Sequence, residues 1–393
     1  MNFKNIEDFM NMWVEKFSPG CCINIYKDGK EVFRYQAGYN DLENKVKLTG
    51  NELFNMYSCT KVATAVSGMQ LLEKGKFLLD EPICEFIPEF KYVTVKDADG
   101  NIKKAEKYIT MRHLLTMTAG FNYVINKTIT DRATEIGNGK ITTISFAKAL
   151  AYQPLSFEPG SRWQYSLCHD VFGAIVEIIT GKRLSEYMRE NIFEPLGMNN
   201  TCFHLPEEKY SQVAEQYSYN VPGEEDIVRL QMSNEEQKGS VIKIDKINKF
   251  KALRGDDIDS GGAGIISNPD DYVKLMAALA NKGMGVNGER ILSPRAVELM
   301  KMNQLSEEML KGFTWPDLQG YGYGLGVRTL MDKVKNGNLG TVGEFGWSGA
   351  AGSTTLADTE LNLAMAFSQH ILNPRESCYC PRLRNVLYSC FDN

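Results

Sequence analysis

The chain has 393 residues, of which 43% are hydrophobic and 24% are charged, and its formal net charge is -5 at pH 7. This is the composition of a globular protein with room for a large core and two lobes. The mild charge and the scattered lysines and arginines argue against a nucleic-acid partner, and no window reaches the roughly 18 apolar residues of a membrane span.

The N-terminal segment, residues 1–20, predicts a short amphipathic helix that ends at Pro19-Gly20. Its acidic residues interrupt the apolar run that a signal peptide needs. The nine cysteines are an odd number without framework spacing, which favours a cytoplasmic protein with reduced thiols. Cys21-Cys22 and Cys378-Tyr379-Cys380 lack nearby histidines and zinc-type spacing, so we expect no metal and no cofactor.

Strands are predicted at both ends of the chain. Residues 21–27 and 31–38 flank Asp28-Gly29, a strong hairpin signature. Short strand-like runs separated by Gly, Asn or Asp follow between 324 and 369, and residues 380–391 predict a closing helix. The middle of the chain is helical, at 58–74, 110–118, 145–153, 168–180, 184–192 and 269–282.

Two segments interrupt the helical middle. Residues 92–110 predict a surface hairpin, and the charged, weakly patterned residues 223–258 predict a mobile flap or a hairpin. The simplest arrangement is an α+β fold, with one antiparallel sheet and flanking helices built from both chain ends, 1–57 and 259–393. An inserted, mainly helical domain takes 58–258, and the cleft between the two parts is the expected place for an active site.

The nucleophile signature S-x-x-K occurs three times, at Ser58/Lys61, Ser145/Lys148 and Ser240/Lys243. Ser240 precedes a polar, strand-like stretch, and Ser145 opens an amphipathic helix on which Lys148 is free to face water. Ser58 begins SCTKVATAVSGMQ, which is apolar or small on nearly every side, as in a buried helix. This context favours Ser58 as the nucleophile.

A lysine one turn into a buried helix costs free energy unless it has a partner or a task. Ser58 and Lys61 share one helical face, so they can hydrogen-bond. Desolvation favours the neutral amine, which can accept the serine proton, and the helix N-terminus favours an oxyanion at Ser58. A capping serine beside a lysine that extends to solvent explains the same residues without catalysis, and it is the more common case for this motif alone.

Two other segments are candidates for the site. Tyr165 follows a Pro-Gly turn at the start of the helix 168–180, and a tyrosine close to a lysine cation ionises more easily and can relay protons. Residues 346–353 are dense in glycine at a strand entry, which predicts close approach by a ligand or another backbone. Taken singly, a core aromatic and a tight turn are the commoner explanations of these two segments.

In order and rough separation, Ser58-Cys59-Thr60-Lys61, Tyr165-Ser166-Leu167 and Trp347-Ser348-Gly349 resemble the three motifs of the penicillin-recognising serine hydrolases, the serine β-lactamase-like group. Supporting stretches extend the resemblance over nearly the whole chain, at 111–121, 157–166, 192–201, 260–272 and 321–327. The resemblance implies a β-lactamase/transpeptidase-like fold.

The resemblance also implies roles for individual residues. Ser58 is acylated, Lys61 activates it, and Tyr165 passes protons to and from the leaving group and the deacylating water. The backbone N–H groups of Ser58 and Ala350 form the oxyanion hole. The residues that bind substrate are Trp347, Ser348, Gly349 and Leu167.

Two positions depart from the β-lactamase pattern. Leu167 stands where an asparagine usually helps hold the substrate amide, and Trp347 stands where a lysine or histidine usually meets the substrate carboxylate. Both changes remove polar contacts for penicillins and for D-Ala-D-Ala ends. Both resemble the esterase branch of the group.

We therefore expect a serine hydrolase with an acyl-serine intermediate, most simply a carboxylesterase on small esters or a related acyltransferase. One alternative is an amide hydrolase, either a β-lactamase or a D-amino-acid peptidase. Another is a non-catalytic ligand-binding relative, which would have no need of Ser58, Lys61 and Tyr165 together. The expected partner is a small-molecule ester or amide, with no nucleic acid and no membrane.

Overall fold

The computed structural model of the protein describes residues 1–97, 99–220, 240–245 and 255–391. The helices are α1 (Lys4–Lys16), α2 (Thr60–Glu73), α3 (Met111–Leu115), α4 (Lys127–Ile136), α5 (Thr143–Leu150), α6 (Cys168–Thr180), α7 (Leu184–Met188), α8 (Pro269–Ala280), α9 (Pro294–Lys301), α10 (Glu307–Leu310), α11 (Lys333–Asn336) and α12 (Glu376–Tyr388). The strands are β1 (Gly20–Lys27), β2 (Lys30–Asp41), β3 (Val46–Lys47), β4 (Phe54–Asn55), β5 (Thr94–Lys96), β6 (Ile102–Lys104), β7 (Gln216–Asn220), β8 (Ser240–Ile244), β9 (Ile266–Ser267), β10 (Tyr321–Tyr323), β11 (Arg328–Leu330), β12 (Phe345–Gly346), β13 (Thr354–Asp358), β14 (Leu363–Gln369) and β15 (Ile371–Leu372).

Strands from both chain ends form one antiparallel sheet, as predicted. Within the described residues its order is β10-β11-β12-β13-β14-β1-β2-β3, so the N-terminal hairpin extends the sheet made by the C-terminal strands. The hairpin turns at Asp28 and Gly29, whose φ angles of 51° and 72° are the conformation that an Asp-Gly turn adopts. The predicted fold class and the predicted hairpin are confirmed.

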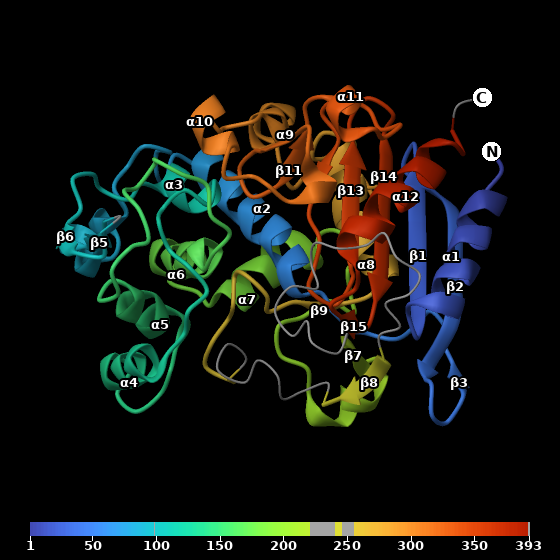
Figure 1. Ribbon diagram of the computed structural model, residues 1–393, viewed down its shortest axis with the longest axis horizontal. Helices are drawn as coiled ribbons and strands as arrows, with labels where there is room; N and C mark the ends of the chain where they lie inside the picture. Colours follow the sequence, from blue (N-terminus) through green and yellow to red (C-terminus); the bar gives the residue numbers. More distant parts are fainter. Residues whose placement is uncertain (98, 221–239, 246–254, 392–393) are drawn as a thin grey trace.

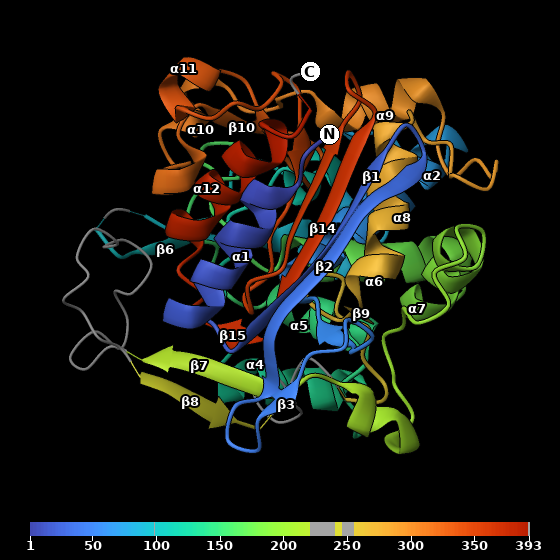
Figure 2. The ribbon, with the colours of Figure 1, turned by 90° about the vertical axis from the view of Figure 1, so that its right-hand side faces the viewer.

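Helices cover both faces of this sheet (Figure 2). The α1 and α12 helices pack together on one face, and α8 packs on the other. The alternation along β1 follows this arrangement: Ile23 and Ile25 join the α1–α12 core, whereas the side chain of Asn24 donates to Asp270 of α8 at 2.8 Å. The central strands β1, β13 and β14 are therefore buried on both sides, whereas the edge strand β3 is exposed.

The α2 helix is the centre of the other half of the molecule. In Figure 1 it runs between the sheet, on the right, and α3 to α6 with the β5–β6 hairpin, on the left. Every residue from Thr60 to Leu71 is buried, as the sequence predicted for a helix that is small or apolar on nearly every side. Gly68 lets α6 approach closely, because a Cβ there would lie 2.6 Å from the Phe172 ring.

The remaining predicted elements agree with the structure to different degrees. The helix at 168–180 has the predicted bounds, and the 92–110 hairpin is the β5–β6 pair. The helix predicted over 184–192 is shorter, since α7 passes into a π-helical turn at Arg189–Phe193. The closing helix begins four residues before Cys380 and carries Pro381 inside it, and α4 and α9 were not predicted.

The inserted segment contributes strands as well as helices. β7 pairs in antiparallel fashion with β8 and in parallel with β15, which follows the last strand of the large sheet. The segment predicted as a flap or hairpin, 223–258, is described only at 240–245 and 255–258; the rest lies outside the described residues. The boundaries at 57/58 and 258/259 stay a prediction.

Candidate active site

Ser58 lies in a short 3₁₀ turn, η1 (Tyr57–Cys59), directly before α2. The φ angle of Tyr57 is 44°, a left-handed conformation that is rare for a bulky residue and costs about 1–3 kcal/mol. Tyr57 is buried against Ala351 and Leu372, which hold the turn in place. The turn leaves Ser58 partly exposed at the mouth of a buried helix.

Lys61 is completely buried, and its partners explain how α2 tolerates it. Its Nζ lies 3.1 Å from Ser58 Oγ and donates to the carbonyl oxygen of Gly262 at 2.7 Å. The same nitrogen lies 4.8 Å from the centre of the Tyr165 ring, within reach of a cation–π contact. Ser58 and Lys61 are therefore within proton-transfer distance.

The lysines of the other two S-x-x-K pairs form ion pairs. Ser145 Oγ accepts the backbone N–H of Thr142 in a capping box, and Lys148 pairs with Glu89 at 2.9 Å instead of extending freely to water. Lys243 pairs with Asp41 at 2.9 Å. Each of these lysines therefore has a carboxylate partner.

Asp170 is a buried charge that the sequence analysis missed. Its Oδ1 accepts Ser260 Oγ at 2.5 Å and the N–H of Gly262 at 3.2 Å. Burial raises the pKa of Asp170, and the positive charge of Lys61 opposes that rise. Gly262 connects the two charges, since its N–H binds Asp170 and its carbonyl binds Lys61; a Cβ at this position would lie 2.5 Å from Asp170 Oδ2.

Tyr165 and Trp347 form a pair that the sequence did not indicate. Trp347 Nε1 donates to the Tyr165 hydroxyl oxygen at 3.0 Å, and the two rings lie 5.4 Å apart. The indole N–H can only donate, so the tyrosine oxygen is the acceptor. The side chain of Tyr123 also hydrogen-bonds to Tyr165. Trp347 is 3% exposed.

The glycine-rich third motif packs directly against the Ser58 turn. A Cβ on Gly349 would lie 2.2 Å from the carbonyl oxygen of Met56, and the Cys59 thiol donates to the carbonyl of Trp347 at 3.8 Å. The predicted close backbone approach is therefore present. Among the described residues, no backbone carbonyl outside the helices and strands accepts the N–H of Ser58 or of Ala350. The oxyanion hole at these two groups stays a prediction.

The predicted substrate-binding residues differ in their exposure. Ser348 is partly exposed, and Gly349 is buried at the contact with the Ser58 turn. Leu167 is completely buried at the N-cap of α6. A direct contact between Leu167 and substrate is therefore not supported, because its side chain presents no surface.

Further aromatic side chains surround Tyr165. Trp315 lies 5.2 Å from the Tyr165 ring and 5.9 Å from the Trp347 ring, and Tyr323 lies 5.1 Å from Trp347. The ring of Tyr123 is 5.4 Å from that of Tyr165 and is 44% exposed. No pattern in the sequence separates these rings from core aromatics, since only the fold brings them together.

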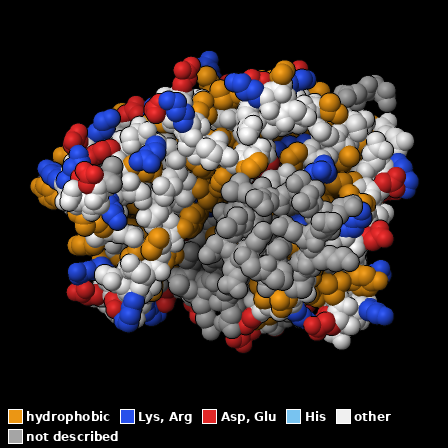
Figure 3. All heavy atoms as spheres, viewed as in Figure 1, with side chains coloured by type: hydrophobic (Ala, Val, Ile, Leu, Met, Phe, Trp, Pro, Cys, Tyr) orange, Lys and Arg blue, Asp and Glu red, His pale blue; other side chains and the backbone are white. Residues whose placement is uncertain are grey.

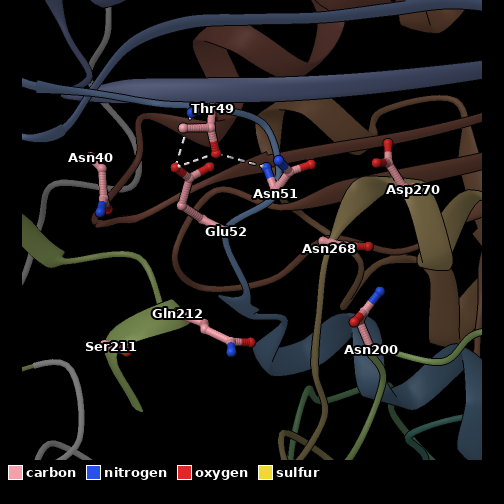
Figure 4. Close-up of a pocket in the computed structure, with 9 residues that line it drawn as sticks. All are labelled: Asn40, Thr49, Asn51, Glu52, Asn200, Ser211, Gln212, Asn268 and Asp270. Carbon is pink, nitrogen blue, oxygen red and sulfur yellow. Dashed lines mark hydrogen bonds between the residues drawn. The ribbon is translucent and has the colours of Figure 1, made fainter. Parts of the chain in front are cut away.

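A separate pocket of about 540 Å³ lies where the β3–β4 connection meets the start of α8 (Figure 4). Its lining is polar: Asn40, Thr49, Asn51, Glu52, Asn200, Ser211, Gln212, Asn268 and Asp270. Several of these side chains form hydrogen bonds with one another or with nearby backbone; for example, Glu52 accepts the N–H and the hydroxyl of Thr49. None of the predicted catalytic residues lines this pocket.

The surface carries charges of both signs. On the face shown in Figure 3, acidic and basic side chains are interspersed, and hydrophobic side chains gather in a band near the middle. In the described part of the chain, every helix is too short or too polar to cross a bilayer.

Several known proteins are similar to this chain in sequence or in structure. Esterase EstB from Burkholderia gladioli is 29% identical over 369 residues, which cover 89% of this chain and 86% of that protein. Acyltransferase calJ from Penicillium decumbens is 27% identical over 362 residues, covering 86% and 81%. The structure of unliganded simvastatin synthase from Aspergillus terreus superposes with a TM-score of 0.78 at 21% identity over the full length of both chains. The beta-lactamase family model matches residues 4–387, and the chain therefore belongs to the beta-lactamase family.

Proposed function

We propose that the protein is a serine carboxylesterase that acts through an acyl-Ser58 intermediate on small neutral esters. The observation that carries the proposal is the contact of Lys61 with Ser58 Oγ at 3.1 Å and with the Tyr165 ring, whose hydroxyl Trp347 holds at 3.0 Å. A nucleophile, a proton acceptor and a proton relay thus lie together. EstB supports the proposal by its name and by its similarity over most of the chain.

In the first half-reaction, Ser58 Oγ attacks the ester carbonyl while its proton passes to the Lys61 amine. The carbonyl oxygen takes up the electron pair and is bound by the N–H groups of Ser58 and Ala350. When the carbonyl re-forms, the C–O bond to the alcohol breaks. Tyr165 gives the departing alkoxide a proton and recovers one from Lys61.

In the second half-reaction, water attacks the acyl-Ser58 carbonyl and loses its proton to the Lys61–Tyr165 pair. The bond to Ser58 Oγ breaks, the carboxylic acid leaves, and the pair returns the proton to Ser58. An alcohol or amine can replace water in this step without any change of residue roles. Acyl transfer therefore belongs to the same proposal, and the similarity to acyltransferase calJ supports it.

We also propose that the protein acts in the cytoplasm, which is favoured by its odd number of cysteines without framework spacing.

An activity-based probe tests the nucleophile. A fluorophosphonate should label the wild type and fail to label Ser58→Ala, while Ser145→Ala serves as the matched control and stays labelled. Labelling of Ser58→Ala at the wild-type rate would overturn the proposal.

Amide hydrolysis is the second candidate, and substrate comparison separates it from ester hydrolysis. Trp347 replaces a cation that would bind a β-lactam carboxylate, and such a charge-assisted hydrogen bond is worth about 1.5–3 kcal/mol. We expect short-chain aryl esters to be hydrolysed with kcat/KM at least about a hundredfold above a chromogenic cephalosporin, and we expect Trp347→Lys to narrow this ratio modestly. Equal efficiency of the wild type on both substrates would favour the amide hydrolase.

A further inference from the structure

Two carboxyl groups lie beside Ser348, behind the third motif. Asp317, in the 3₁₀ turn η7 (Pro316–Leu318), and Glu376, the first residue of α12, come together with Cys380, and one ligand atom of each lies within 4.8 Å of the others. Ser348 Oγ is 4.0 Å from the Cys380 thiol and hydrogen-bonds to Glu376. We call Asp317, Glu376 and Cys380 the acidic cluster.

The charges around the acidic cluster do not balance when every group is ionised. Arg328 and Arg384 are the cations that face it, and both are nearly completely buried. A third acid, Glu344, accepts the Tyr321 hydroxyl and lies 4.0 Å from Arg328. Three carboxyl groups thus share two guanidinium groups, and the pKa values of Asp317 and Glu376 are both raised.

The acidic cluster fits a titratable acid better than a metal site. Its neighbours Arg328 and Arg384 are permanent cations, which would repel a metal ion. Burial and the charge of Asp317 raise the pKa of Glu376 to about 7. The charge beside Ser348 therefore changes within the range in which esterases are assayed.

The position of Tyr165 indicates which part of a substrate meets this charge. In the proposed function, Tyr165 protonates the departing alcohol, so the alcohol portion lies beside the Tyr165 hydroxyl. Trp347 binds that hydroxyl at 3.0 Å, and Ser348 follows Trp347 in the chain. Ser348 is partly exposed and bonds Glu376, so an alcohol portion that extends past Trp347 to Ser348 meets the charge of the acidic cluster there.

We propose, on the basis of the proposed function, that Glu376 with Asp317 is a specificity determinant that places negative charge beside the alcohol portion of the substrate. The site then selects esters of cationic or neutral alcohols and rejects esters whose alcohol carries a carboxylate. The aromatic rings of Trp347 and Trp315 reinforce the preference for a cation. The selectivity grows as the pH rises through neutrality, because Glu376 then ionises.

Three acetate esters test the proposal: 3-acetoxybenzoate, its neutral methyl ester, and 3-acetoxy-N,N,N-trimethylanilinium. All three give the same acetyl-enzyme, so differences in kcat/KM report the alcohol portion. Each value is divided by that of Glu376→Gln, which cancels the intrinsic reactivity of the ester. The control is Glu89→Gln, a similarly buried glutamate paired with Lys148 in the helical half.

At pH 8.5 we expect the cationic-to-anionic ratio of the wild type to exceed that of Glu376→Gln by about 5- to 50-fold, and at pH 5.5 by less than about threefold. Glu89→Gln should show the same cationic-to-anionic ratio as the wild type at both pH values.

If Glu376→Gln does not fold, the wild type is tested by itself: 0.5 M NaCl should reduce its cationic-to-anionic ratio at pH 8.5 at least about threefold. The inference would be overturned by equal cationic-to-anionic ratios in the wild type and Glu376→Gln. It would also be overturned by a wild-type ratio that changes with neither pH nor salt. Failure to hydrolyse any of the three esters would overturn the proposed function instead.

Discussion

The hydrogen bond from Trp347 to Tyr165 gives the sharpest test of how the site works. Trp347→Phe keeps an aromatic ring among Tyr165, Tyr323 and Trp315 and removes only the indole N–H and part of the ring. A hydrogen bond to a group that becomes charged contributes about 1.5–3 kcal/mol. If the tyrosine oxygen gains negative charge during proton transfer, kcat/KM should fall by about 10- to 100-fold.

The assay is hydrolysis of 4-nitrophenyl butyrate across pH 5.5–9.5, with thermal unfolding measured in parallel. The loss of kcat/KM should be present across this pH range, since the donor that binds the Tyr165 oxygen is removed at every pH. Trp315→Phe is the matched control, because Trp315 contacts the Tyr165 ring at 5.2 Å without donating to its hydroxyl, and it should stay within about threefold of the wild type. A Trp347→Phe variant with kcat/KM within threefold of the wild type across this pH range would refute the reasoning.

Three further predictions concern the base, the backbone contact and a buried acid. Lys61→Met and Tyr165→Phe should each lower kcat on the same ester by about 10²–10⁴-fold, while circular dichroism shows that both variants stay folded. Losses below fivefold in both variants would show that another base acts. Gly349→Ala should lose esterase activity at least about tenfold and unfold at lower temperature, because its Cβ would meet a carbonyl oxygen at 2.2 Å; unchanged kinetics would show that the turn yields freely. Burial raises the pKa of Glu177 to about 7, so its stabilising contribution is complete below pH 4.5 and is lost as the pH rises through 7. Glu177→Gln should therefore gain up to about 3 kcal/mol relative to the wild type between pH 5 and pH 8.5 in urea unfolding, and equal pH dependence of the two proteins would contradict this assignment.

The sequence by itself predicted the parts of the fold that local patterns control. The Asp28-Gly29 turn needs two residues that tolerate positive φ, and both adopt it. The α2 helix was predicted as buried because its composition leaves no polar face, and it is buried from Thr60 to Leu71. Local signals for α9 were also present, since Ser293 and Pro294 form an N-cap and first turn, but the prediction did not use them.

Within the candidate site, sequence order and spacing were enough to choose Ser58 among three S-x-x-K serines and to associate Lys61 and Tyr165 with it. These inferences rest on near neighbours along the chain and on a pattern of three motifs. The roles of these residues remain a proposal that the labelling and variant experiments test. The predicted contact of Leu167 with substrate was not supported, because a motif position does not reveal whether its side chain faces the cleft or the core.

Tertiary structure decided which distant residues support the site. Gly262 reaches Lys61 from 201 residues away, Trp347 reaches Tyr165 from 182, and Glu376 lies beside Ser348 only because α12 returns to the sheet. Glycine, tryptophan and glutamate have no period or spacing that marks such contacts, since each contact depends on the crossing of elements far apart in the chain. Local preferences therefore predicted the hairpin turn and the buried α2 helix and favoured Ser58 as the nucleophile, whereas packing determined the groups that contact Lys61, Tyr165 and Ser348.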